Sequence, residues 1–327
     1  MHAELLEILR CPQSGRRLVL EQPEYRGERV HSGWLISEGG AHRYAICDFI
    51  PRFVPESNYA DNFGMQWNKF RQTQLDSYSG HPISANRFWK ATGWHPEDMA
   101  GQWVLDAGCG AGRFAEVALQ AGTKVIALDY SSAVDACYAN LKHHPNLHVV
   151  QGDVYALPFV RDFFPFVYSL GVLQHTPDVA KAFAALPPMV ARGGQLCVDF
   201  YEHSWKCWLW PKYWIRPITK QMSQERLFKI LQRWVANLLS ISIALQRVPL
   251  VGSSVKHLVP VANYHGIYPL SDQQLREWAL LDTFDMFAPK FDSPQTAGAV
   301  QRLLRKSGLR EIKVLKAGHL VGRGRKP

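Results

Sequence analysis

Short apolar runs and helical segments alternate through the middle of the chain. The apolar runs lie at 103–108, 124–131, 147–153, 166–173 and 195–201, and helical periodicity marks 115–122 and 133–143. Runs of this length are typical of buried strands, and the intervening segments place apolar residues on one helix face. This alternation predicts a parallel sheet with helices on both faces.

The two ends of the chain carry different patterns. Residues 1–57 are strand-like, with turn residues such as Pro12 and the pair Gly39-Gly40, and 58–100 read as helices that lead into the sheet. Near the C-terminus, 294–308 predicts a helix closed by Gly308. Two final strands are expected at 310–316 and 319–326.

A helical insert is predicted between the main strands and this C-terminal part. Its apolar residues recur at steps of three and four: Leu227, Leu231, Trp234, Leu238, Ile241 and Leu245. The predicted division is a small β-rich unit at 1–57, a core with its helical lead-in at 58–202, the insert at 203–289, and a return to the core sheet at 290–327.

Composition fits a folded protein of about two domains, since the chain has 327 residues, 47% of them hydrophobic and 20% charged. The six cysteines show no disulfide-like rhythm and the first residues do not resemble a secretory signal, so a reducing cytoplasm is the expected location. We find no apolar run of the roughly 18 residues that a membrane span needs.

The net charge of +9 is concentrated in the insert, together with tryptophans. The segment 203–260 holds one acid, Glu225, against nine basic residues: Lys206, Lys212, Arg216, Lys220, Arg226, Lys229, Arg233, Arg247 and Lys256. Three interpretations stay open: a membrane-surface element, a nucleic-acid surface, and a helical cap whose charges are simply solvated. The clustered tryptophans favour the membrane over nucleic acid, and possible peripheral contact is assigned to 205–246.

The glycine cluster at 104–113, VLDAGCGAGR, follows the first predicted core strand. Gly108, Gly110 and Gly112 give G-x-G-x-G, which is neither the dinucleotide fingerprint G-x-G-x-x-G nor a P-loop. Asp106 at the strand end would repel a pyrophosphate, but it suits a ligand with an ammonium or sulfonium charge.

Two further acids end the next two predicted strands. Asp129 stands where a carboxylate takes both hydroxyls of an adenosine ribose. Asp153 is placed to accept from an adenine amino group, and Val154 and Leu157 to pack on the purine face. Because the carboxyl ends of parallel strands meet at one edge, these residues predict a sulfonium-nucleoside site.

The motifs VLDAGCGAGRF, ALDYS, QGDVYALPF and YSLGVLQHTPD, in this order, resemble the class I S-adenosylmethionine-dependent methyltransferases of the UbiE-like type. The resemblance implies a Rossmann-like α/β fold with a seven-stranded sheet whose last strand is antiparallel, and S-adenosylmethionine as cofactor. The cofactor-binding residues it implies are Asp106, Gly108, Cys109, Gly110, Gly112, Asp129, Tyr130, Asp153, Val154 and Leu170, with Phe63, Gln66, Trp67 and Arg71 of the lead-in.

The sequence departs from the family pattern at three places. Pro165 stands where an Asp is usual, Gln174 replaces the first of a His-His pair, and Ala191-Arg192 replaces a Lys-Pro. None of them is an expected cofactor contact.

The methyl acceptor is expected to bind beyond the cofactor. Methyl transfer is a displacement that depends on in-line positioning, and His175 is the candidate base for an oxygen nucleophile, with helix capping as its alternative role. The candidate substrate contacts are Tyr201, Glu202, Tyr264, His265 and Asp285, the last three in segments that would form a lid.

Residues 1–57 resemble a zinc-ribbon domain that accompanies some methyltransferases. Cys11 begins the expected C-P-x-C, but Ser14 occupies the place of the second thiolate, and Cys47 is the other cysteine of this segment. Structural zinc needs four nitrogen or sulfur ligands, so we expect a degenerate ribbon and no metal site.

The preferred hypothesis is therefore a methyltransferase that acts at oxygen on a small-molecule, lipid-linked or glycan biosynthetic intermediate. A tRNA-modifying methyltransferase is the alternative within the same chemistry. A non-catalytic partner protein that keeps the fold is the alternative from another class.

Overall fold

A computed structural model describes residues 1–54, 61–203, 210–249, 252 and 256–327. Its helices are α1 Glu4–Ile8, α2 Asp61–Lys69, α3 Asp76–Ser79, α4 Ile83–Thr92, α5 Pro96–Met99, α6 Arg113–Gln120, α7 Ala133–Leu141, α8 Val179–Ala184, α9 Pro211–Thr219, α10 Gln224–Gln246, α12 Asp272–Phe287 and α13 Ala297–Lys306. Its strands are β1 Leu18–Arg26, β2 Arg29–Ser37, β3 Arg43–Cys47, β4 Ile50–Arg52, β5 Trp103–Ala107, β6 Lys124–Asp129, β7 Leu147–Gln151, β8 Phe164–Ser169, β9 Val190–Phe200, β10 Arg310–Ala317 and β11 His319–Arg325. The short 3-10 helices are η1 Val154–Ala156, η2 Leu173–His175, η3 Pro187–Met189 and η5 Lys256–Leu258.

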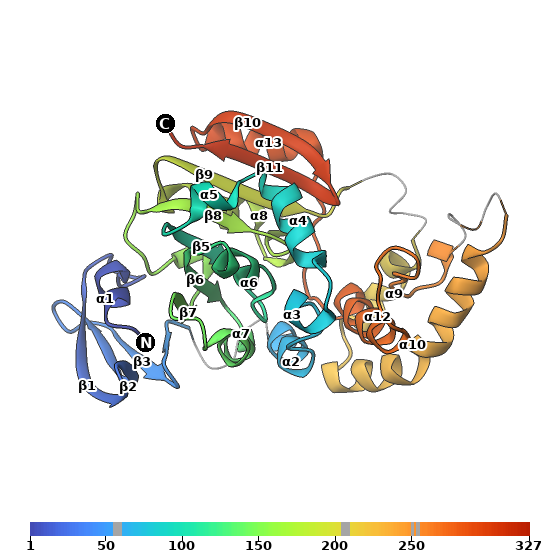
Figure 1. Cartoon of the computed structure of the whole chain (residues 1–327), viewed down its shortest axis with the longest axis horizontal. Coiled ribbons are helices and arrows are strands. Elements are labelled where there is room, and N and C mark those ends of the chain that lie inside the picture. Colours follow the sequence, from blue (N-terminus) through green and yellow to red (C-terminus); the bar gives the residue numbers. More distant parts are fainter. Residues whose placement is uncertain (55–60, 204–209, 250–251, 253–255) are drawn as a thin grey trace.

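One mixed sheet runs through the described part of the chain, in the order β1-β2-β3-β4-β7-β6-β5-β8-β9-β11-β10 (Figure 1). The pairs β7–β6, β6–β5, β5–β8 and β8–β9 are parallel, and β11 is antiparallel to both β9 and β10. The α/β sheet and its antiparallel last strand are confirmed.

The predicted count of seven strands is wrong for the sheet as a whole, because the N-terminal strands extend it to eleven. The junction is the parallel pairing of Arg52 in β4 with Gln151 in β7. The Arg52 side chain also donates to the Gln151 side-chain oxygen at 2.8 Å and to Asp135 at 2.7 Å. Pairing with β4 covers an edge of β7 that would otherwise expose unpaired backbone groups.

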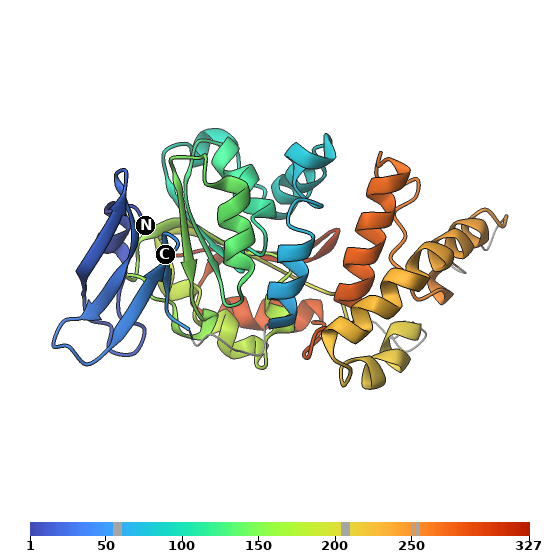
Figure 2. The same ribbon diagram turned by 90° about the horizontal axis from the view of Figure 1, so that it is seen from below.

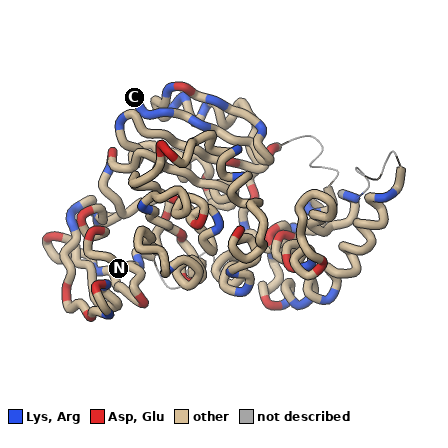
Figure 3. Tube along the Cα trace, viewed as in Figure 1, with Lys and Arg blue, Asp and Glu red and all other residues tan. Residues whose placement is uncertain are grey.

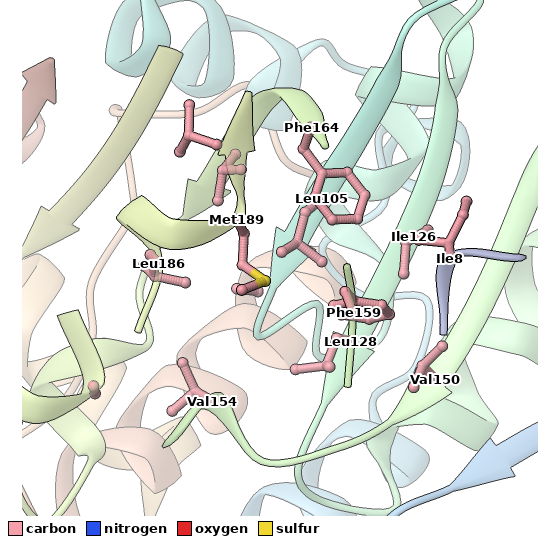
Figure 4. Close-up of a cluster of buried hydrophobic side chains, with 14 of the residues drawn as sticks. Ile8, Leu105, Ile126, Leu128, Val150, Val154, Phe159, Phe164, Leu186 and Met189 are labelled. Atoms are coloured by element: carbon pink, nitrogen blue, oxygen red, sulfur yellow. The ribbon is translucent and has the colours of Figure 1, made fainter. Parts of the chain in front are cut away.

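Alternate residues of the core strands enter two separate apolar clusters. In β5, Leu105 belongs to one cluster, together with Val150, Phe159 and Met189, and its neighbour Val104 to the other (Figure 4). Successive side chains of a strand point to opposite faces, so the two clusters lie on opposite sides of the sheet. The first also takes in residues of α1, α8 and α13, and the second those of α4, α6 and α7. Helices therefore cover both faces of the sheet.

The cap helices α9, α10 and α12 lie at the end of the molecule opposite the N-terminal strands (Figure 2). α10 and α12 enclose an apolar cluster of their own, which includes Leu227, Leu231 and Leu239. The predicted apolar face of α10 is wrong in part, because Trp234 and Ile241 are exposed. The α10 sequence offers two overlapping apolar stripes, and packing against α12 buries one of them.

The insert residues Trp205, Lys206 and Trp208 lie outside the described residues.

Two of the basic residues counted in the charged segment 203–260 point into the protein. Lys212 forms an ion pair with Asp292 at 2.9 Å, and Arg216 donates to the carbonyls of Met286 and Pro289. Among the described helices, none has the length and apolar character that crossing a membrane requires.

We predict that Phe159→Ala lowers the free energy of unfolding by about 3–5 kcal/mol, the usual cost of removing a buried aromatic ring. Phe159 is buried in the apolar cluster that also contains Ile8 and Leu9, and its backbone forms a β-bridge with Leu9, so it joins the N-terminal unit to the core. Urea unfolding followed by circular dichroism measures the loss. Val19→Ala is the control, since Val19 is exposed. Equal stability of the two variants would contradict an apolar core shared by the N-terminal unit and the main sheet.

Candidate active site

The turn between β5 and α6 is held in shape by packing on three sides. Gly108, Gly110 and Gly112 all adopt positive φ angles, 101°, 52° and 94°. A Cβ atom at Gly108 would lie 2.3 Å from Val172, one at Gly112 would lie 2.7 Å from Leu141, and one at Gly110 would lie 3.2 Å from the Trp67 ring. The turn therefore requires glycine for backbone conformation and for close approach.

The Asp129 carboxylate ties this turn to the end of β6. One oxygen accepts from the Gly110 backbone N–H at 3.0 Å, and the other accepts from the Ser131 N–H and hydroxyl at 2.8 and 2.7 Å. Gly108 N–H and Cys109 N–H both donate to the Leu128 carbonyl on the same strand. The ends of β5 and β6 are thereby fixed relative to each other.

Asp106 is buried inside this edge, level with Tyr168 of β8. Its Oδ2 atom has no hydrogen-bond partner in the part of the chain that the structure describes. Burial raises the pKa of Asp106 to about 8, the Tyr168 hydroxyl opposes this shift, and the charge of Asp129 adds to it. The Asp106 side chain, which the sequence predicted to be a charged carboxylate, is therefore mostly protonated near pH 7, because desolvation penalises the ionised form.

Helix α2 lies over the glycine turn and the start of α7. Its Asn68 side chain donates to the Ser132 carbonyl at 2.9 Å, and Trp67 packs on Gly110. Gln66 is buried, and neither atom of its amide has a partner among the described residues. Arg71 is exposed, and its carbonyl accepts from Asn140.

The next positions along the edge are Tyr130, Asp153, Val154 and Leu170. The Tyr130 carbonyl accepts from Gln151, and Asp153 caps η1 by accepting from the Tyr155 N–H at 2.9 Å. Burial raises the pKa of Asp153 above its ordinary value. Val154 and Leu170 are buried, at the starts of the segments after β7 and β8.

His175 lies between α2 and the end of β9. Its ring centroid is 5.4 Å from those of both Phe63 and Tyr201. Its Nδ1 lies 3.1 Å from the Phe291 carbonyl, while Nε2 is buried with no partner among the described residues. The alternative capping role is not seen, since Asp178 caps the following helix.

The candidate substrate residues lie at two places, directly after β9 and in or just before α12. The Tyr201 hydroxyl donates to Asp285 at 3.1 Å, so β9 and α12 meet there. Tyr264 donates to Asp282 one turn earlier in α12. His265 is half-buried, and its N–H donates to the Asn263 side chain. Glu202 is exposed and forms an ion pair with Lys316.

A polar chain that the sequence interpretation missed joins the core to the cap helices. Arg113 donates to Gln74 at 2.8 Å, and Gln74 donates to Asp282 at 3.0 Å. Burial raises the pKa of Asp282 to about 6. One signal was available: Arg113 occupies the first turn of α6, where the helix dipole disfavours a cation.

A second missed pair is Arg87 with Asp199. The Arg87 guanidinium contacts the Asp199 carboxylate at 2.8 Å, and the same carboxylate accepts from the Gly171 N–H at 2.5 Å. This pair holds the turn after β8 against β9. Nothing in the local sequence pattern around Arg87 indicates it.

No group of three or more His, Cys, Asp or Glu side chains comes together as a metal site within the described residues. In the N-terminal unit, Cys11 is buried and lies 3.3 Å from the Tyr44 hydroxyl, and the Ser14 N–H donates to its sulfur at 3.4 Å. The zinc-ribbon resemblance stays a prediction.

Comparison with known proteins accords with this strand-end geometry. Residues 105–198, which include the glycine turn and all three strand-end acids, match the family described as methyltransferase domain. This match supports a class I S-adenosylmethionine-dependent methyltransferase domain at these residues.

Three relatives resemble the methyltransferase domain. The demethylmenaquinone methyltransferase of Renibacterium salmoninarum is 32% identical over 32% of this chain and 44% of its own length. The ubiquinone biosynthesis O-methyltransferase of Aromatoleum aromaticum is 30% identical over 34% of this chain and 49% of its own length. The tRNA U34 carboxymethyltransferase of Pseudoalteromonas translucida is 29% identical over 41% of this chain and 43% of its own length. The chain thus spans less than half the length of these relatives.

The residues of the methyltransferase domain fit its cofactor, S-adenosylmethionine. Glycines at 108 and 110 bring the backbone close to the edge, and Asp129 presents a carboxylate there. Buried polar atoms of Gln66 and Asp106, without partners in the described chain, remain available for a polar ligand.

We predict that Asp106→Asn reduces the pH dependence of stability between about pH 4 and pH 8. In this window the folded protein holds a proton that the unfolded chain releases, because the pKa of Asp106 is raised from 3.8 to about 8. The free energy of unfolding therefore falls as pH rises, and this contribution reaches at most about 1.4 kcal/mol per pH unit.

Urea titrations at several pH values measure this slope. Asp98→Asn serves as the control, since Asp98 is exposed. An unchanged slope in Asp106→Asn would show that Asp106 is ionised in the folded protein at neutral pH.

Proposed function

We propose that this protein is an S-adenosylmethionine-dependent methyltransferase that methylates an oxygen atom of a small-molecule, lipid-linked or glycan biosynthetic intermediate. One observation carries the proposal: the turn that contains Gly108 and Gly110 is closely packed and is hydrogen-bonded through the Gly110 N–H to the Asp129 carboxylate. This turn lies inside residues 105–198, which match the methyltransferase domain. When bound, S-adenosylmethionine supplies a methyl group activated by the positive charge on its sulfur.

Several residues of the carboxyl edge are proposed to hold this cofactor. Asp129 would accept from ribose hydroxyls, and Asp153 from the adenine amino group, with Val154 packing on the ring. Asp106 and Gln66 would bind the polar end of the molecule, since both have buried polar atoms without a partner in the described part of the chain. The remaining members of the proposed cofactor set are Gly112, Cys109, Tyr130, Leu170, Phe63, Trp67 and Arg71.

His175 is the proposed general base. Since the Phe291 carbonyl can only accept a hydrogen bond, the hydrogen bond at Nδ1 places the proton there and leaves a lone pair on Nε2. Nε2 is buried and has no hydrogen-bond partner among the described residues. A general base needs such a free nitrogen to accept the proton of an acceptor hydroxyl. Tyr201, Asp285 and Tyr264, contributed by the core and the cap, are the proposed acceptor contacts, together with His265 and Glu202.

The alternatives differ in the acceptor or in turnover. The tRNA U34 carboxymethyltransferase relative supports a tRNA acceptor, and the basic residues of α10 suit phosphates. The ubiquinone biosynthesis O-methyltransferase relative supports a small-molecule oxygen acceptor instead. A non-catalytic partner would bind the cofactor without consuming it.

The direct test is an acceptor screen with S-adenosylmethionine labelled in its methyl group. Label transferred to an oxygen of an extractable small or lipid-linked molecule, with equimolar S-adenosylhomocysteine, is the expected result. Label in tRNA would establish the alternative acceptor. Cofactor binding by calorimetry without transfer to any acceptor class would favour the non-catalytic protein.

We predict that Asp129→Ala weakens S-adenosylmethionine binding at least about tenfold, since hydrogen bonds to a charged group contribute about 1.5–3 kcal/mol each. Calorimetry measures the change, and circular dichroism reports whether the fold is retained. Asp129→Asn keeps the side-chain volume and should also bind weakly, whereas Asp98→Ala, at an exposed site, should bind normally. Normal affinity in both Asp129 variants would contradict the cofactor assignment.

We predict that His175→Ala lowers kcat about a hundredfold or more and leaves cofactor affinity nearly unchanged, as expected for loss of a general base. With the acceptor from the screen, the acidic limb of the pH–rate profile should disappear in this variant. His143→Ala is the matched control, because His143 is exposed. An unchanged profile in His175→Ala would assign the histidine a packing role.

A further inference from the structure

Helix α10 has two apolar sides, and the structure covers only one. Leu227, Leu231 and Leu239 pack against α12. On the other side Ile230, Trp234 and Ile241 are 40%, 52% and 51% exposed. These three residues are separated by four and seven positions, so they form one stripe along the helix.

A basic stripe runs beside this apolar stripe. Arg226, Lys229 and Arg233 are exposed and spaced by three and four residues. With Ile230 and Trp234 they line an open groove of about 540 Å³. None of the three takes part in an ion pair within the described chain, whereas Lys212 and Arg216 of α9 turn inward to Asp292. We call these six residues, Arg226, Lys229, Ile230, Arg233, Trp234 and Ile241, the α10 face.

The acids of the cap do not neutralise the α10 face. Glu225 is the one acid of α10 and also borders the groove. The other cap acids lie mainly about α12 (Figure 3). The basic charge therefore stays available to an external anionic surface.

We propose that the α10 face docks the protein on an anionic lipid membrane, with its apolar stripe at the acyl boundary and its basic stripe on the headgroup phosphates. An exposed apolar stripe flanked by Arg and Lys is the arrangement that interfacial helices use. Trp234 suits the headgroup level, where an amphipathic ring is stable. Helix α9 adds exposed Trp214 and Ile218, 65% and 69% exposed and one turn apart.

Aliphatic residues decide between a membrane and nucleic acid. Arg226, Lys229 and Arg233 would serve phosphates of either partner, and Trp234 would stack on a base. Ile230 and Ile241 have no flat ring to stack and gain nothing from a solvated RNA backbone. Burial in lipid removes them from water, which is favourable.

A second copy of the chain fits the α10 face poorly. A two-fold interface would bring the same three cations of each copy together, with Glu225 as the one bordering acid of each copy to pair them. Docking on a membrane would bring the protein to a lipid-linked acceptor, and in this respect the proposal rests on the proposed function. Its physical test does not require turnover.

The test is sedimentation of the full-length protein with phosphatidylcholine vesicles, with and without phosphatidylglycerol, over a range of salt. We expect binding only to the anionic vesicles, and weaker binding as salt rises. A variant with Arg226→Gln, Lys229→Gln and Arg233→Gln should lose on the order of a hundredfold in partitioning, since each basic residue contributes about fivefold. Trp234→Gln with Ile241→Gln should lose at least about tenfold.

The control removes three positive charges from α13 by Arg302→Gln, Arg305→Gln and Lys306→Gln, all of them exposed. This variant should bind vesicles as the unmodified protein does. All substitutions are at exposed positions, and cofactor binding by calorimetry verifies that each variant is folded.

Three results would overturn the proposal: no vesicle binding, equal losses in the α13 control, or retained binding in the α10 variants. Binding to tRNA that depends on Arg226, Lys229 and Arg233 but not on Ile241, without vesicle binding, would assign the α10 face to nucleic acid. Concentration-dependent dimerisation abolished by Ile241→Gln would assign it to a second copy. Methyl transfer without vesicle binding leaves the proposed function intact, and vesicle binding without transfer leaves the docking surface intact.

Discussion

The hydrogen bond from the Gly110 N–H to the Asp129 carboxylate joins the ends of two adjacent parallel strands. The geometry of the candidate active site depends on it, because the glycines of the turn have no side chains of their own to hold the turn against β6. The same carboxylate accepts from Ser131, so one half-buried acid fixes both the turn after β5 and the turn after β6. A charged acceptor in a region of low dielectric strengthens such bonds.

The other side of the site depends on contacts between segments far apart in the chain. Arg113 reaches Asp282 through Gln74, and Tyr201 reaches Asp285, so that α12 is tied to the core by two separate polar connections. Partly buried polar groups of this kind favour one relative placement of core and cap, since any other would leave hydrogen bonds unmade. The apolar packing of α10 against α12 leaves the α10 face exposed.

Prediction from sequence was most successful for the strand–turn–helix units. The strands at 103–107 and 124–129 and the helix before Gly308 lie where local periodicity placed them, because alternation and capping are short-range properties. The sequence also brought Asp106 and Asp129 to one sheet edge. It did not indicate that burial would raise the pKa of Asp106 to about 8, because desolvation depends on which segments distant in sequence pack around the carboxyl group.

The order of the apolar runs was enough to predict an α/β sheet, and the glycine spacing with Asp106, Asp129 and Asp153 was enough to predict a sulfonium-nucleoside site. The methyltransferase domain and its cofactor, S-adenosylmethionine, followed from the resemblance of the motifs to a known family. Tertiary structure alone decided that the N-terminal strands continue the core sheet through Arg52 and Gln151. It also decided that α10 buries Leu239 and exposes Trp234. Both outcomes depend on which surface a neighbour covers, and local periodicity holds no information about that neighbour.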